Sequence, residues 1–98
     1  MEKGTPHTKL DRVKALVRGG KIRATFSSIS DAAKLGMSVA DMGAVIEALT
    51  IQDFYKSMTT HADHRIWQDV YRPHTTAGPV YLKLTVVEDV LIVSFKEL

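Results

Sequence analysis

Residues 54–98 read FYKSMTTHADHRIWQDVYRPHTTAGPVYLKLTVVEDVLIVSFKEL, and this stretch decides the fold. Apolar and polar residues alternate along segments 54–60, 66–73, 80–87 and 90–97, with the period of two that is typical of half-buried β-strands. The connections between these segments are short and polar, which requires neighbouring strands to run antiparallel. The pattern therefore predicts a meander of four strands.

The first half of the chain carries helical signals instead. Thr5-Pro6 is typical of an N-cap followed by proline at the first helical position. Ser28 with Asp31, and Ser38 with Asp41, have the spacing of a capping box in which aspartate takes the acidic role. Apolar residues then recur at helical intervals, which predicts helices near 6–18, 28–35 and 39–49, and a short alternating segment predicts a strand at 21–26.

These elements combine into one predicted architecture. The last two strands have a strongly apolar face, which the amphipathic helices must cover. We expect an α+β domain with about three helices packed on one face of a mostly antiparallel, roughly five- to six-stranded twisted sheet. Because the chain has 98 residues and no linker or repeat, we expect a single domain over residues 1–98.

Composition excludes several kinds of site. The chain has no cysteine, which excludes disulfide frameworks, thiolate zinc sites and cysteine nucleophiles. A hydrophobic fraction of 45% is typical of a globular protein rather than a disordered one. No apolar run approaches the roughly 18 residues of a membrane span, and the N-terminus lacks the apolar region of a signal peptide. We therefore expect a cytoplasmic protein without membrane contacts.

Positive charge is concentrated near the N-terminus. Residues 1–23 contain seven lysines and arginines against two acids, a net charge of +5, whereas residues 24–98 contain six cations against nine acids. Such a segment can attract phosphate groups without sequence preference. The alternative is that these cations form only the solvated face of the first helix.

The polar positions of the four predicted strands carry reactive side chains. Side chains alternate between the two faces of a strand, and this alternation, or parity, places four of them on the face opposite the expected core: Lys56, Gln68, Tyr81 and Lys96. In the last strand, parity groups Val90 and Ile92 with Lys96 rather than with Phe95. Parity does not encode the register between strands, and a one-residue bulge would break the common face. The same face is expected to collect Arg72, Lys83, Met58 and Ser94.

This set has the chemistry needed to cleave RNA through its own 2′-hydroxyl. Lys56 and Lys96 would surround the phosphate, and a lysine crowded by a second cation has a lowered pKa and can act as acid or base. Tyr81 would donate a proton or orient the hydroxyl, and Gln68 would position the substrate. The division of roles among the two lysines and Tyr81 stays open. The alternative is that all four are solvated sheet residues, with lysines that discourage edge aggregation.

The histidines and aromatic residues give weaker evidence of a functional role. His61 and His64 could bind a metal ion, but no third ligand is near, so we expect an exposed turn and no metal site. His7, near a helix start, could contact substrate or remain packed or solvated. Four aromatic residues alternate opposite the polar set and are predicted to be core rather than a base-stacking platform: Tyr55, Trp67, Tyr71 and Phe95.

The segment FYKSMTTHADHRIWQDVYRP, at 54–73, resembles the motility quorum-sensing regulator toxins, MqsR. The resemblance continues through GPVYLKLT at 78–85 and DVLIVSFKE at 89–97, and the opening MEK and TPHT also match. It covers essentially the whole chain, although residues 24–50 match only loosely. The chain departs from the family at His61, where a tyrosine is expected, and in loop 74–79. These departures bear on base preference and antitoxin pairing rather than on the chemistry.

The resemblance implies a type II toxin with the RelE-like fold, an endoribonuclease that cleaves free mRNA at GCU-type sites and arrests growth. The family's functional residues match here as Lys56, Gln68, Tyr81 and Lys96. Around them we expect further RNA contacts from Arg72, Lys83, Met58, Ser94 and His7. The resemblance also implies an antitoxin partner, MqsA, with a zinc-binding N-terminal domain and a helix-turn-helix DNA-binding C-terminal domain, whereas no cofactor is expected in this chain.

Two other functions compete with ribonuclease activity. One is a non-catalytic module that binds RNA or protein. The other is a transcriptional co-regulator, which would act on DNA only through a DNA-binding partner, because the sequence contains no evident recognition helix.

Overall fold

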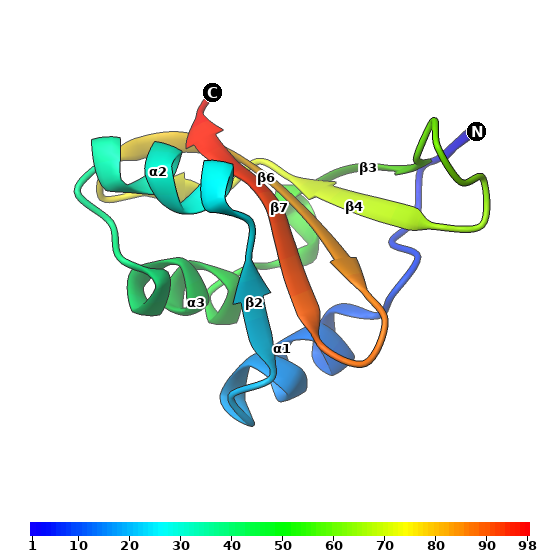
Figure 1. Ribbon diagram of the computed structural model, residues 1–98, viewed down its shortest axis with the longest axis horizontal. Coiled ribbons are helices and arrows are strands. Elements are labelled where there is room, and N and C mark those ends of the chain that lie inside the picture. Colours follow the sequence, from blue (N-terminus) through cyan, green and yellow to red (C-terminus); the bar gives the residue numbers. More distant parts are fainter.

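The computed structural model describes residues 1–98 and contains a mixed, mostly antiparallel sheet (Figure 1). Its strands are β1 (Glu2–Lys3), β2 (Ile22–Ala24), β3 (Phe54–Thr59), β4 (Trp67–Tyr71), β5 (His74–Thr75), β6 (Gly78–Val86) and β7 (Val90–Glu97). Six lie in the order β1-β3-β4-β6-β7-β2, and β5 pairs with β6 outside this order. Only β2, beside β7, is paired in parallel. The predicted meander, β3-β4-β6-β7, is confirmed.

Three helices cover one face of this sheet: α1 (Leu10–Arg18), α2 (Phe26–Lys34) and α3 (Val39–Glu47) (Figure 1). A short 3-10 turn, η1 (Ile51–Asp53), leads from α3 into β3. One buried cluster joins Val13, Ala32 and Met42 of the helices to Leu82 and Phe95 of the sheet. The predicted α+β class is therefore confirmed. None of the helices is long and apolar enough to cross a membrane.

α1 begins later than Thr5-Pro6 predicts. Lys9 is the N-cap residue, and its side chain makes no capping hydrogen bond. The backbone N–H groups of His7 and Thr8 instead donate to the buried carboxylate of Asp69, at 3.0 and 3.1 Å. The segment before α1 is therefore held against the sheet, and the predicted helix start at residue 6 is wrong.

α2 takes Thr25, not Ser28, as its N-cap. The Thr25 hydroxyl accepts a hydrogen bond from the N–H of Ser28 at 3.2 Å. Ser28 lies inside the helix, where its hydroxyl donates to the carbonyl of Thr25 at 2.8 Å. The predicted pair of Ser28 and Asp31 is therefore wrong, whereas Ser38 and Asp41 form the predicted capping box of α3.

A bulge in β7 changes which residues of that strand face the core. The register between β6 and β7 shifts at Val93, which is left without a paired residue. An extra residue in one strand reverses the alternation beyond it. Ile92 and Val90 are therefore fully buried with Phe95, and the predicted grouping of these two residues with Lys96 is wrong.

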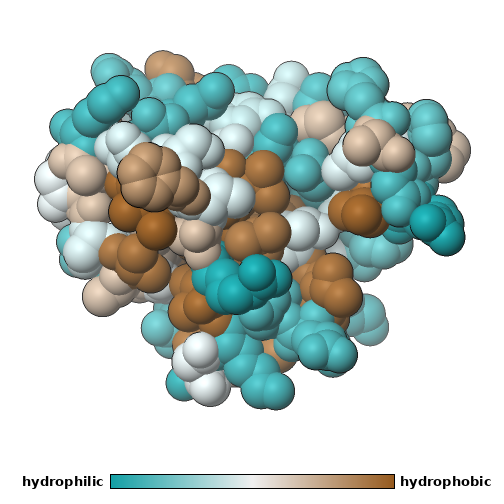
Figure 2. Space-filling model, in the orientation of Figure 1, coloured by the Kyte–Doolittle hydropathy of each residue, from teal (hydrophilic) through white to brown (hydrophobic).

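Apolar side chains also reach the surface, some of them on α2. Phe26 is 88% exposed and Ile29 is 40% exposed. Figure 2 shows brown, apolar atoms at the surface on the α2 and α3 side of the molecule, among the teal polar ones. The helical layer therefore leaves part of its own apolar surface uncovered.

Candidate active site

One row of paired residues crosses four strands on the face of the sheet opposite the helices. Lys56 of β3 pairs with Val70, and Val70 pairs with Lys83. Lys83 in turn pairs with Ser94 of β7. Val70 is fully buried, yet it does not belong to the cluster beneath the helices. Its two lysine partners flank it in the row and share its face of the sheet.

The other expected site residues lie in the rows on either side. Tyr81 pairs with Lys96, and Met58 pairs with Gln68. Each lies two positions from a residue of the central row, and side chains two apart in a strand share a face. The register therefore brings one set of side chains together on this face: Lys56, Gln68, Tyr81 and Lys96, with Met58, Lys83 and Ser94 among them.

Lys56 and Lys96 approach this face from opposite sides. β4 and β6 lie between their strands, so three strand intervals, about 14 Å in all, separate the two backbones. The Nζ atom of Lys96 lies 5.6 Å from the centre of the Tyr81 ring. A substrate laid across the strands would therefore meet Tyr81 and Lys96 on one side and Lys56 on the other.

Lys56 has a partner that strand parity does not reveal, the carboxylate of Glu2 on the edge strand β1. Nζ of Lys56 lies 3.2 Å from Oε1 of Glu2, and the side chains are 30% and 63% exposed. The hydrogen bond to Glu2 raises the pKa of Lys56, and the opposing effect of partial desolvation does not cancel this rise. The expected lowering of a lysine pKa is therefore wrong for Lys56, because its nearest charge is an anion.

Tyr55 is exposed beside Lys56 rather than buried. The register between β3 and β4 shifts at Tyr55, and its side chain is 48% exposed. The guanidinium carbon of Arg72 lies 4.5 Å from the centre of the Tyr55 ring. The core prediction is therefore wrong for Tyr55, because of the bulge, and confirmed for Tyr71 and Phe95, which are fully buried.

His7 lies on the helical side of the sheet. Its ring stacks on the half-buried Trp67, with ring centres 5.3 Å apart and planes at 13°. Trp67 precedes Gln68 in β4 and therefore points to the other face. The Nζ atom of Lys3 lies 4.2 Å from the centre of the same indole. The structure does not bring His7 to the face of Lys56, where an RNA contact was expected.

Asp69 is an organising residue that sequence reasoning missed. Besides the two N–H groups before α1, its carboxylate accepts a hydrogen bond from the buried hydroxyl of Ser57 at 2.6 Å. The available signal was an acid at a core-facing position of β4, between Trp67 and Tyr71. A buried carboxylate requires several donors, and here they include the segment that follows β1.

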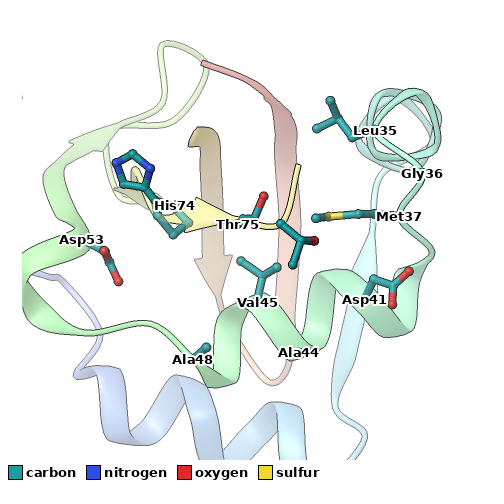
Figure 3. Close-up of a pocket in the computed structure, with 12 residues that line it drawn as sticks. Leu35, Gly36, Met37, Asp41, Ala44, Val45, Ala48, Asp53, His74 and Thr75 are labelled. Carbon is teal, nitrogen blue, oxygen red and sulfur yellow. The ribbon is translucent and has the colours of Figure 1, made fainter. Parts of the chain in front are cut away.

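A separate cavity of about 540 Å³ lies between α3 and β5, away from this face (Figure 3). Asp41 and Asp53 contribute carboxylates to its lining, but both already accept capping hydrogen bonds. None of the candidate catalytic residues lines it. His61 and His64 lie in the predicted turn, and both are exposed.

Comparisons with known proteins agree on one family. Residues 5–97 match the family model described as "Motility quorum-sensing regulator, toxin of MqsA". The chain is also 59% identical over 97 residues to "mRNA interferase toxin MqsR" of Escherichia coli (strain K12), an alignment that covers 99% of each protein.

Proposed function

This chain belongs to the family of motility quorum-sensing regulator toxins, and we propose that it is a metal-independent endoribonuclease that cleaves mRNA. The proposal rests on the rows of paired residues that lie on the face of the sheet opposite the helices. Two lysines, a phenol and an amide share this face. A cation pair of this kind supplies preorganised stabilisation for a dianionic phosphorane.

The proposed reaction is an internal transesterification. The 2′ oxygen attacks the adjacent phosphorus and gives its proton to a general base, and the bond to the 5′ oxygen breaks as that oxygen takes a proton from a general acid; the candidates for these two roles are Lys56, Tyr81 and Lys96. The products are a 2′,3′-cyclic phosphate and a 5′-hydroxyl end. Lys56 and Lys96 stabilise the phosphorane charge, and Tyr81 protonates the leaving oxygen or orients the attacking hydroxyl. Gln68 positions the substrate.

Neighbouring side chains extend this site along the RNA. Lys83 lies in the central row, and the Arg72 guanidinium packs on the exposed ring of Tyr55. Both offer phosphate contacts, which position a nucleic acid without reading its sequence. Met58 and Ser94 lie on the same face and would contact the sugar and base next to the cleaved bond.

We further propose that cleavage occurs in the cytoplasm at GCU-type sites and arrests growth. The family description, "toxin of MqsA", supports a partner antitoxin that neutralises this activity. Such an antitoxin would carry a zinc-binding N-terminal domain and a helix-turn-helix domain, so that any DNA contact is made by the antitoxin. Zinc would then belong to the antitoxin rather than to this chain.

Strand addition is the proposed mode of antitoxin binding. β1 and β2 form the two edges of the sheet, and an exposed edge offers unpaired backbone groups to another chain. Substitutions that disrupt pairing at these edges should weaken antitoxin binding. Unchanged affinity in such variants would exclude this mode.

Incubation with an mRNA that contains GCU, in the presence of EDTA, tests the proposed function. Cleavage with 2′,3′-cyclic phosphate ends is expected. Binding without cleavage would favour the competing non-catalytic RNA-binding module. Cleavage that EDTA abolishes would reject the metal-independent mechanism.

A further inference from the structure

The short edge strand β1 carries a carboxylate onto the candidate active face. Glu2 pairs with Met58 in antiparallel register, and Met58 pairs with Gln68. Because paired residues point to the same face, Glu2 joins the row that contains Gln68. From this position its Oε1 atom lies 3.2 Å from the Nζ atom of Lys56.

Several contacts hold β1 in place. Its backbone pairs with β3, and the N–H of Thr59 donates to the carbonyl of Met1 at 3.0 Å. The side chain of Lys3 extends to the opposite face, where its ammonium group lies over the ring of Trp67. Asp69 fixes the following segment through the backbone of His7 and Thr8. The Glu2 carboxylate is therefore presented by an anchored backbone.

Glu2 and Lys56 also line a hollow of about 420 Å³, together with Lys3, Gly4 and Tyr55. An ammonium group has three N–H donors, and the contact with Glu2 occupies one of them. The remaining donors are free for a substrate phosphate. Glu2 can therefore hold Lys56 without withdrawing it from RNA.

We propose that Glu2 is a positioning residue that holds the ammonium group of Lys56 at the substrate face, an inference that rests on the proposed ribonuclease function. Lys56 then acts as a cation that stabilises the phosphorane, and the 2′ proton passes to Tyr81 or Lys96. The hydrogen bond to Glu2 also raises the pKa of Lys56, which agrees with this role. The titratable and charged groups around Lys56 on this face are Glu2 of β1, Tyr55 of β3, Arg72 after β4, Tyr81 and Lys83 of β6 and Lys96 of β7.

Glu2→Gln in the full chain tests this role, with Glu88→Gln as the matched control. Glu88 lies in the exposed turn between β6 and β7, so its substitution changes the net charge equally without touching the site. Cleavage of a GCU-containing RNA gives kcat and KM at pH 7. In parallel, NMR titration of the Lys56 side chain measures its pKa without relying on activity.

The expected result is a kcat reduced about two- to fivefold by Glu2→Gln, because an exposed ion pair of this kind has a modest effect. KM should stay within about twofold, since the contact supports the transition state more than substrate binding. The pKa of Lys56 should fall in Glu2→Gln and not in Glu88→Gln. Glu2→Asp should keep kcat and the pKa of Lys56 between the values of the wild type and Glu2→Gln. Unfolding temperatures should match the wild type, which separates positioning from a structural role.

Two results would overturn the proposal. If Lys56 were the general base, losing Glu2 would increase its deprotonated fraction, and Glu2→Gln would cleave RNA as fast as the wild type or faster at pH 7. An unchanged pKa of Lys56 in Glu2→Gln would show that Glu2 does not engage the ammonium group of Lys56. A wild type that does not cleave RNA would instead reject the proposed function, and the titration would still decide whether Glu2 controls Lys56.

Discussion

The buried carboxylate of Asp69 should be one of the most important polar groups for the stability of this fold. Asp69 is 2% exposed, and its partner Ser57 is fully buried. Its oxygens accept hydrogen bonds from the Ser57 hydroxyl at 2.6 Å and from the N–H groups of His7 and Thr8 at 3.0 and 3.1 Å. Asp69→Ala removes the acceptor of all three donors at once.

The cost of Asp69→Ala follows from the fate of each donor. The Ser57 hydroxyl is left buried without a partner, which costs about 1–3 kcal/mol. The N–H groups of His7 and Thr8 lie near the surface and can be rehydrated, so we assign each a lower cost of about 1 kcal/mol. The total is about 3–5 kcal/mol, a large part of the 5–15 kcal/mol or so that stabilises a typical domain.

Urea unfolding at pH 7, followed by circular dichroism, measures this loss. Asp69→Asn should cost less than Asp69→Ala, because the amide keeps one acceptor oxygen. Glu88→Ala, in an exposed turn, is the control and should change stability by less than about 0.5 kcal/mol. A cost below about 1 kcal/mol for Asp69→Ala would show that the hydrogen bonds to this carboxylate do not anchor the N-terminal segment.

Three further predictions concern catalysis, packing and acid stability. Tyr81→Phe and Lys96→Ala should each lower kcat about 10²-fold in the RNA cleavage assay while the melting temperature stays unchanged, and full activity in both would show that the site is misassigned. Trp67→Ala should destabilise by about 2 kcal/mol in urea, below the 3–5 kcal/mol of a fully buried aromatic residue, because the indole is only half-buried. The hydrogen bond from Arg23 lowers the pKa of Asp89 below its usual 3.8, so this pair stabilises the fold above that pH and loses its effect as the pH falls through the lowered value. Asp89→Asn should therefore show a smaller loss of stability between about pH 5 and pH 2 than the wild type, and equal losses would contradict this linkage.

The sheet and its polar face could be predicted because alternation is a local property. The alternation in β4 and β6 required only neighbouring residues, and it separated Gln68 and Tyr81 from the positions that face the helices. Parity failed where one residue was inserted. Tyr55 and Val93 each sit at a register shift, and nothing in their side chains marks them as bulge residues.

The contacts that organise the site were not predictable because they join distant parts of the chain. The carboxylate of Glu2 reaches Lys56 only because β1 pairs with β3, and two-residue strands have no periodicity to detect. The late start of α1 has the same origin. Thr5-Pro6 is a good local helix signal. The helix nevertheless does not begin there, because the N–H groups of His7 and Thr8 donate to Asp69.

The proposed mechanism depends on attack by the 2′-hydroxyl, and a substrate that lacks this one oxygen tests that step. An RNA oligonucleotide that contains GCU is compared with the same oligonucleotide carrying a single 2′-deoxy nucleotide at the mapped cleavage site, both with EDTA present. We expect cleavage of the all-RNA substrate to a 2′,3′-cyclic phosphate and no cleavage at the deoxy position. Cleavage at the deoxy position would contradict this mechanism, because the nucleophile would then have to be another group.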